Sequence, residues 1–160
     1  MAKFQMKELI PATAKTARLG AGSGSANYVD DKEVGKAVKL VAESRFNLCA
    51  AGDQIEGFIG AVEGATMDDF TIGSVFNEPG MRKEVTFDGL QATPGTGVLA
   101  IGDRVVTGTV VAKGTALGNV PVKVCKATTQ TGMDFVWRVV SLGSAGTGAV
   151  GTTGVIERVS

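Results

Sequence analysis

The sequence contains no histidine, and only two of its 160 residues are cysteine. Without histidine, neither a Ser-His-Asp triad nor a Cys-His pair is possible, and no metal site has an imidazole ligand. Two cysteines are too few for a zinc site built from cysteine alone within one chain. With these sites excluded and no other plausible active site in the sequence, we expect no catalytic residue, no metal and no cofactor, and we predict that the protein is not an enzyme.

The formal net charge is zero, because sixteen basic residues balance sixteen acidic ones. A nucleic-acid-binding domain usually carries a basic surface, so no direct contact with nucleic acid is expected. Low net charge does not oppose association between proteins, and it suits a protein that packs against others.

Long apolar runs are missing as well, since glycine or charged residues interrupt every one of them. The sequence therefore predicts no transmembrane helix and no membrane partner. The first twenty residues also lack the apolar core of a signal peptide. Because secretion is not expected, Cys49 and Cys125 are predicted to be buried, reduced thiols.

Glycine, in contrast, is abundant: it occupies 23 positions, about twice the usual share of ~7%. Each glycine inside a helix costs about 1 kcal/mol, so this abundance favours turns and strands. Short segments rich in Val, Thr, Ile and Phe recur roughly every 8–12 residues, as in all-β folds. We predict a small β-barrel or β-sandwich of about eight to ten short strands, preceded by an extended N-terminal arm.

Composition divides the chain into three parts. Residues 1–29 are basic at first and then read "GAGSGSA" at 20–26, which is typical of an arm followed by a flexible linker. Residues 30–142 are predicted to form the β-rich body. Residues 143–160 are predicted to form a glycine-rich loop and a last strand.

Two features that suggest ligand chemistry have a simpler interpretation. The run "GTGAVG" at 146–151 matches G-x-G-x-x-G, but it opens no predicted helix and no acidic residue follows about 20 positions later, so nucleotide binding is not expected. Six acidic residues and no basic one lie between Phe46 and Gly80. They match no calcium-loop pattern, and we interpret them as solvated turn and edge charges or as an acidic contact face.

A Gly-Asp pair occurs twice, in "AGDQIEGFI" at 51–59 and in "IGDRVVTGTV" at 101–110. An aspartate side chain accepts a hydrogen bond from a nearby backbone N–H in a tight turn. We interpret Gly52-Asp53 and Gly102-Asp103 as structural turns with the same chemistry. The spacing differs by one residue, so this is not a strict repeat.

The segment "DFVWRVVSLG" alternates in the manner of a strand with one buried face. Phe135, Trp137 and Val139 share that face. They are predicted to be core residues.

Three stretches together resemble the small capsid decoration (cement) proteins of tailed bacteriophages. They are "VGKAVKLVAESRFNLCAAGDQIEGFIGAVE", then "TIGSV" with "RKEVTF", and later "IGDRVVTGTVVAKG". The resemblance covers residues 34–113 well and the C-terminal strands loosely. It is a pattern of strands and turns without catalytic residues.

The resemblance implies a structural protein of the virion that is made in the host cytoplasm and binds the outer surface of the head shell. Its partners would be the major capsid protein and further copies of itself, as a dimer or trimer. Such proteins stabilise the shell by bridging its subunits, and multivalency strengthens many modest contacts.

The arm lies outside the resemblance, but its apolar and basic residues suit contacts with the capsid or a neighbouring copy. The candidate contact residues are Phe4, Met6, Lys7, Leu9, Ile10, Lys15 and Arg18. Lys3 is a further candidate because it is basic. The alternative function is a ligand-binding β-barrel of the virion that recognises carbohydrate or a host surface. One Trp and one Tyr offer it few aromatic contacts.

Overall fold

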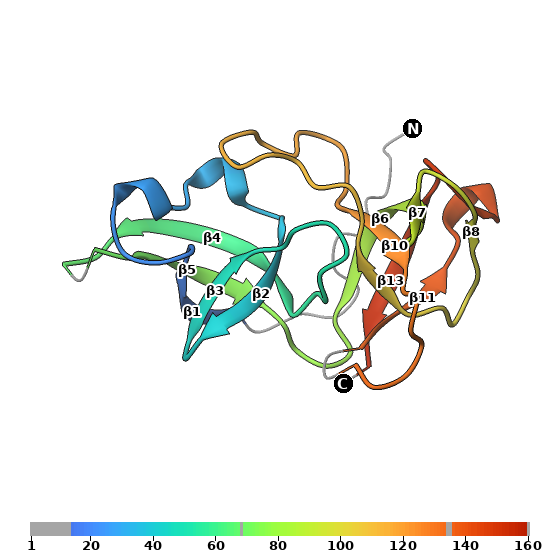
Figure 1. The fold of residues 1–160 in the computed structure, drawn as a ribbon, viewed down its shortest axis with the longest axis horizontal. Helices are drawn as coiled ribbons and strands as arrows, with labels where there is room; N and C mark the ends of the chain where they lie inside the picture. Colours follow the sequence, from blue (N-terminus) through green and yellow to red (C-terminus); the bar gives the residue numbers. More distant parts are fainter. Residues whose placement is uncertain (1–13, 68, 134–135, 160) are drawn as a thin grey trace.

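The computed structural model describes residues 14–67, 69–133 and 136–159. Within those ranges the chain forms thirteen strands and three short 3-10 helices, which confirms the all-β prediction. Ten of these strands have three residues or more, and they build two β units that lie side by side (Figure 1).

The strands of the first unit are β1 (Ala14–Leu19), β2 (Ala37–Ala42), β3 (Arg45–Leu48), β4 (Gly57–Ala65) and β5 (Thr71–Phe76). They close into a barrel in the order β1-β3-β2-β4-β5, because β1 pairs with β5 as well as with β3. Inward-facing side chains such as Leu19, Val38 and Val75 fill its interior. The predicted β-barrel is therefore present.

The second unit is a sheet in the order β11-β13-β6-β10-β9. Its strands are β6 (Arg82–Leu90), β9 (Val105–Thr107), β10 (Lys123–Lys126), β11 (Trp137–Ser141) and β13 (Thr153–Arg158). An antiparallel bridge between Arg104 and Arg138 joins the two outer strands. The backbone of Val139 extends this bridge: its N–H donates to Asp103 O at 2.9 Å and its C=O accepts from Gly102 N at 2.8 Å.

Of three two-residue strands, one extends this unit and two form a separate small sheet. β7 (Thr93–Pro94) pairs with β6, and β8 (Val98–Leu99) pairs with β12 (Gly148–Ala149).

The two units have the same strand order. In each, the first strand lies parallel to the third and antiparallel to the fifth. In each, the second strand contacts the third and the fourth, although in the second unit the latter contact is only the Arg104–Arg138 bridge. The chain therefore repeats one strand order, although the sequence shows no strict repeat.

The units share their largest apolar cluster. Phe58 of β4 meets Trp137 of β11 edge to face, with ring centroids 5.1 Å apart, and neither side chain is exposed. Arg158 at the end of β13 donates through Nη1 to Glu56 O at 2.9 Å and to Asn77 O. Burial lowers the pKa of this guanidinium, with Glu56 and Glu78 acting in the opposite direction. These contacts join the second unit to the first.

The predicted extent of the N-terminal arm is wrong. Residues 14–29 are not part of an arm, because β1 is a wall of the first barrel and its Ala17 and Leu19 are buried. The linker that follows leads into the 3-10 helix η1 (Ser25–Asn27), and Gly24 N donates to Asp69 O at 3.0 Å. At the other end, the predicted last strand is present as β13, which lies between β11 and β6 in the second unit. Residues 1–13 of the predicted arm are outside the described residues.

Candidate functional site

The most distinctive feature of the surface is residues 108–122, a long connection between β9 and β10 that we call the strap. It crosses from the second unit to the first (Figure 1, gold to orange). Lys113 Nζ donates to Ala26 O at 2.8 Å. The 3-10 helix η2 (Asp31–Glu33) provides the other anchor, beginning where the side chain of Asp30 accepts from Lys32 N at 2.9 Å.

A buried ion pair holds the strap. Lys36 Nζ lies 2.6 Å from Glu33 Oε2, and the side chains are 7% and 1% exposed. The strap adds hydrogen bonds to this pair: Glu33 Oε1 accepts from Gly114 N at 2.5 Å, and Lys36 Nζ donates to Ala112 O at 2.9 Å. A buried charge is tolerated only when it is paired and hydrogen-bonded, so this pair ties the strap to a defined position.

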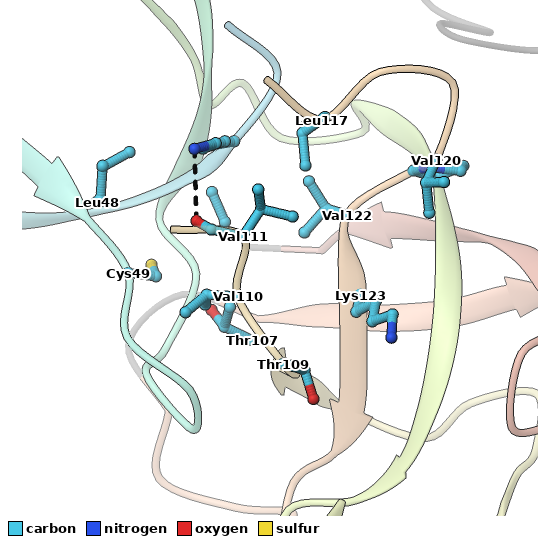
Figure 2. A pocket seen from close by; sticks show the side chains of 13 residues that line it. Leu48, Cys49, Thr107, Thr109, Val110, Val111, Leu117, Val120, Val122 and Lys123 are labelled. Atoms are coloured by element: carbon cyan, nitrogen blue, oxygen red, sulfur yellow. Dashed lines mark hydrogen bonds between the residues drawn. The ribbon is translucent and has the colours of Figure 1, made fainter. Parts of the chain in front are cut away.

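The strap covers a cavity of about 120 Å³. Figure 2 shows Leu48 and Cys49 on one side of this cavity and Leu117 and Val122 on the other. A hydrogen bond from Lys36 Nζ to Val111 O, 3.4 Å long, joins two residues that line the cavity. The lining is mainly apolar, and this cavity has the size that suits a single apolar group.

A larger groove of about 310 Å³ lies at the junction of the units, lined by residues of both units and of the strap. Strap residues Leu117 and Val120 form one side, and Phe76 of β5 belongs to the other. Val120 is 55% exposed and Val34, which also lines the groove, is 39% exposed. Apolar side chains here remain accessible to a partner.

The two Gly-Asp turns have nearly the same geometry, as their shared chemistry predicts. Asp53 Oδ2 accepts from Ala50 N at 2.7 Å, and Lys39 Nζ lies 2.5 Å from the same oxygen. Asp103 Oδ2 accepts from Ala100 N at 2.8 Å, and Lys126 Nζ lies 2.9 Å from Oδ1.

The glycines allow this geometry because Gly52 and Gly102 have φ of 83° and 92°, which other residues rarely adopt. Each turn also receives a strand from the second unit: Thr107 N donates to Asp53 O, and Val139 N donates to Asp103 O, both at 2.9 Å. Both aspartates therefore have structural partners.

Most of the predicted contact residues, Phe4, Met6, Lys7, Leu9 and Ile10, lie outside the described residues. The structure places Lys15 and Arg18 in β1. Lys15 Nζ pairs with Glu78 of the same chain at 3.4 Å, and the Arg18 guanidinium lies 5.0 Å from the centroid of the Phe70 ring. Since both are held by the barrel, they are not arm residues.

Two of the three predicted core residues are completely buried: Trp137 and Val139 are both 0% exposed. Phe135 lies outside the described residues. Both cysteines are buried and unpaired. Burial raises the pKa of the Cys49 thiol and of the Cys125 thiol to about 11 in each case. Thiols with such a pKa are protonated at neutral pH and react slowly.

Sequence reasoning missed the strap and its anchor. Glu33 and Lys36 have the i,i+3 spacing of a possible ion pair. The sequence around them does not show that residues 112–114 fold back onto this pair. Among the described residues, no group of three acidic or cysteine side chains is arranged to hold a metal ion. No helix within the described ranges is long and apolar enough to cross a membrane.

The chain matches no known family model, no curated protein and no solved structure at a significant level.

Proposed function

We propose that this protein is a capsid decoration protein that binds the outer surface of a phage head and stabilises it by bridging major capsid subunits. The proposal rests on the resemblance of residues 34–113, a stretch that includes four strands of the first barrel, the β6 strand and the Gly-Asp turns. In this proposal the protein has no catalytic activity and needs no cofactor.

The surface suits such a role. Val98 and Ile101 are 59% and 67% exposed next to the small β8–β12 sheet, and Val150 is 40% exposed. Val110 and Val120 of the strap are 43% and 55% exposed. Apolar side chains at separate places allow one copy to contact several subunits, and simultaneous engagement raises binding strength without new chemistry. We further propose that copies associate with one another and that residues 1–13 take part in contacts on the shell.

The alternative, a carbohydrate- or host-surface-binding barrel, has less support. A sugar-binding groove commonly uses an exposed aromatic ring, but Trp137 is 0% exposed. Tyr28, the single tyrosine, donates through its hydroxyl to Asp69, and this hydrogen bond raises the pKa of the phenol.

The test is to add the purified protein to undecorated phage heads. We expect saturable binding, measured by co-sedimentation, and a higher temperature of DNA release. A matched variant lacking residues 2–13 tests the terminal segment; the deletion must stop there because β1 begins at Ala14. If the full chain neither sediments with heads nor protects them, the capsid assignment is wrong. If the truncated chain binds and protects equally well, only the role of residues 1–13 is wrong.

A further inference from the structure

The described chain begins beside the groove at the junction of the two units. Ala14, the first residue of β1, is paired with Phe76, and Phe76 lines the groove. Lys15 pairs with Glu78 just beyond it. The lining combines apolar side chains with Lys83, Glu84 and Asn119. Residues 1–13 therefore join the body at a point that is already next to this groove.

Those thirteen residues, MAKFQMKELIPAT, are rich in apolar side chains. Ile10 lies four residues before Ala14, within about 14 Å along an extended chain. The groove of about 310 Å³ offers exposed Val34 and Val120 and the half-buried Leu117. Burying such side chains is worth about 25 cal/mol per Å² of apolar surface, less the cost of ordering the segment.

We propose that this groove binds residues 1–13 of the same chain in the free protein. The tether favours the chain's own segment over a second copy, because a short connection holds it at a high effective concentration. Its apolar side chains are thereby kept from water until a stronger partner competes for them. This inference does not depend on the capsid proposal, since it concerns the protein in isolation.

Limited proteolysis of the full chain tests the contact. Trypsin cleaves after Lys7 only when this segment is released, so cleavage of the wild-type chain should be slow. Val120→Asp places a charge in the groove and should accelerate cleavage at least about tenfold. Val98→Asp is the matched control, because Val98 is similarly exposed, at 59% against 55%, but does not line the groove. Equal cleavage rates in the wild type and in Val120→Asp would overturn the proposal.

A pair of new cysteines identifies the occupant. In Ile10→Cys/Val120→Cys, mild oxidation should give a disulfide within one chain, whereas Ile10→Cys/Val98→Cys should react much more slowly. The native Cys49 and Cys125 are buried, and peptide mass mapping of the oxidised chain shows which cysteines have paired. Covalent dimers in place of the internal disulfide would show that a second copy fills the groove, and they would overturn the assignment to the same chain. Equal oxidation of both pairs would overturn it as well.

Discussion

The two units of this protein share one strand order but close in different ways. Six residue pairs join β1 to β5 in the first barrel. Within the described part of the second unit, the single Arg104–Arg138 bridge connects β9 with β11. The connection between the second and third strands also differs, since Glu43-Ser44 forms a tight turn in the first unit and residues 108–122 form the strap in the second.

The difference shows where the second unit obtains its support. The short pairing between β9 and β11 is reinforced by contacts between the second unit and the first. These contacts are the Phe58–Trp137 pair, the hydrogen bonds of Arg158 and the strap anchored on Glu33 and Lys36. The first barrel has its own apolar cluster inside a closed wall. We therefore expect the junction to contribute more to the second unit than to the first.

The largest expected effect comes from Trp137. Trp137→Ala should lower the free energy of unfolding by roughly 3–5 kcal/mol, because it removes a fully buried ring from the shared cluster. Chemical denaturation of the wild type and variant measures this loss. Val98→Ala serves as the control in the same unit, since Val98 is 59% exposed. A loss below about 1 kcal/mol would mean that the ring does not anchor the junction.

The strap anchor should have a smaller but still clear effect. Lys36→Met leaves Glu33 buried without its cation and should cost about 3 kcal/mol. The double variant Glu33→Gln/Lys36→Met removes both charges and should recover much of the loss. Denaturation of the single and double variants measures both values. If the double variant is no more stable than Lys36→Met alone, the cost does not come from an uncompensated charge.

The sequence was sufficient for the fold class because the signals were local. Alternating apolar residues around Val85 and Phe87 and frequent glycines indicate strands and turns regardless of what they pack against. The Gly-Asp turns were predicted for the same reason, because Asp53 and Asp103 bond to backbone groups only three residues away.

The rest depends on contacts between distant residues. Nothing in the segment 14–19 distinguishes an arm from a barrel strand until Phe76 and Phe46 are known to pair with it. The strap was missed on the same ground, since Lys36 and Ala112 are 76 positions apart. The shared strand order of the two units could not be predicted from the sequence. Many different sequences satisfy the same strand pairing and burial, so the two units need not be similar in sequence.

The two Gly-Asp turns give a direct comparison between the units. Asp53→Ala and Asp103→Ala each remove an acceptor for a backbone N–H and a lysine partner, and each should cost about 1–2 kcal/mol. Asn at either position retains the acceptor and should recover part of the loss. Thermal unfolding of the four variants measures this. Costs that differ by more than about 2 kcal/mol would show that the turns are not equivalent.

The smallest expected effect concerns the two buried thiols, Cys49 beside the first barrel and Cys125 in the second unit. The pKa of both thiols is raised to about 11, so the native chain should react slowly with iodoacetamide at pH 8. After denaturation without reductant, both should react. Because the unfolded thiols ionise near pH 9 and the folded ones near 11, their contribution to stability is complete below pH 9 and is lost as the pH rises through 11.

The order of labelling tests the role of the strap. Cys49 lines the cavity beneath the strap and is 7% exposed, whereas Cys125 lies within β10 and is 1% exposed. Opening of the strap uncovers Cys49 without separating the strands around Cys125, so Cys49 should be labelled first. Lys36→Met should accelerate labelling of Cys49 much more than that of Cys125, as measured by peptide mass mapping at several times. Equal acceleration of both thiols would mean that the ion pair stabilises the whole molecule and not the strap alone.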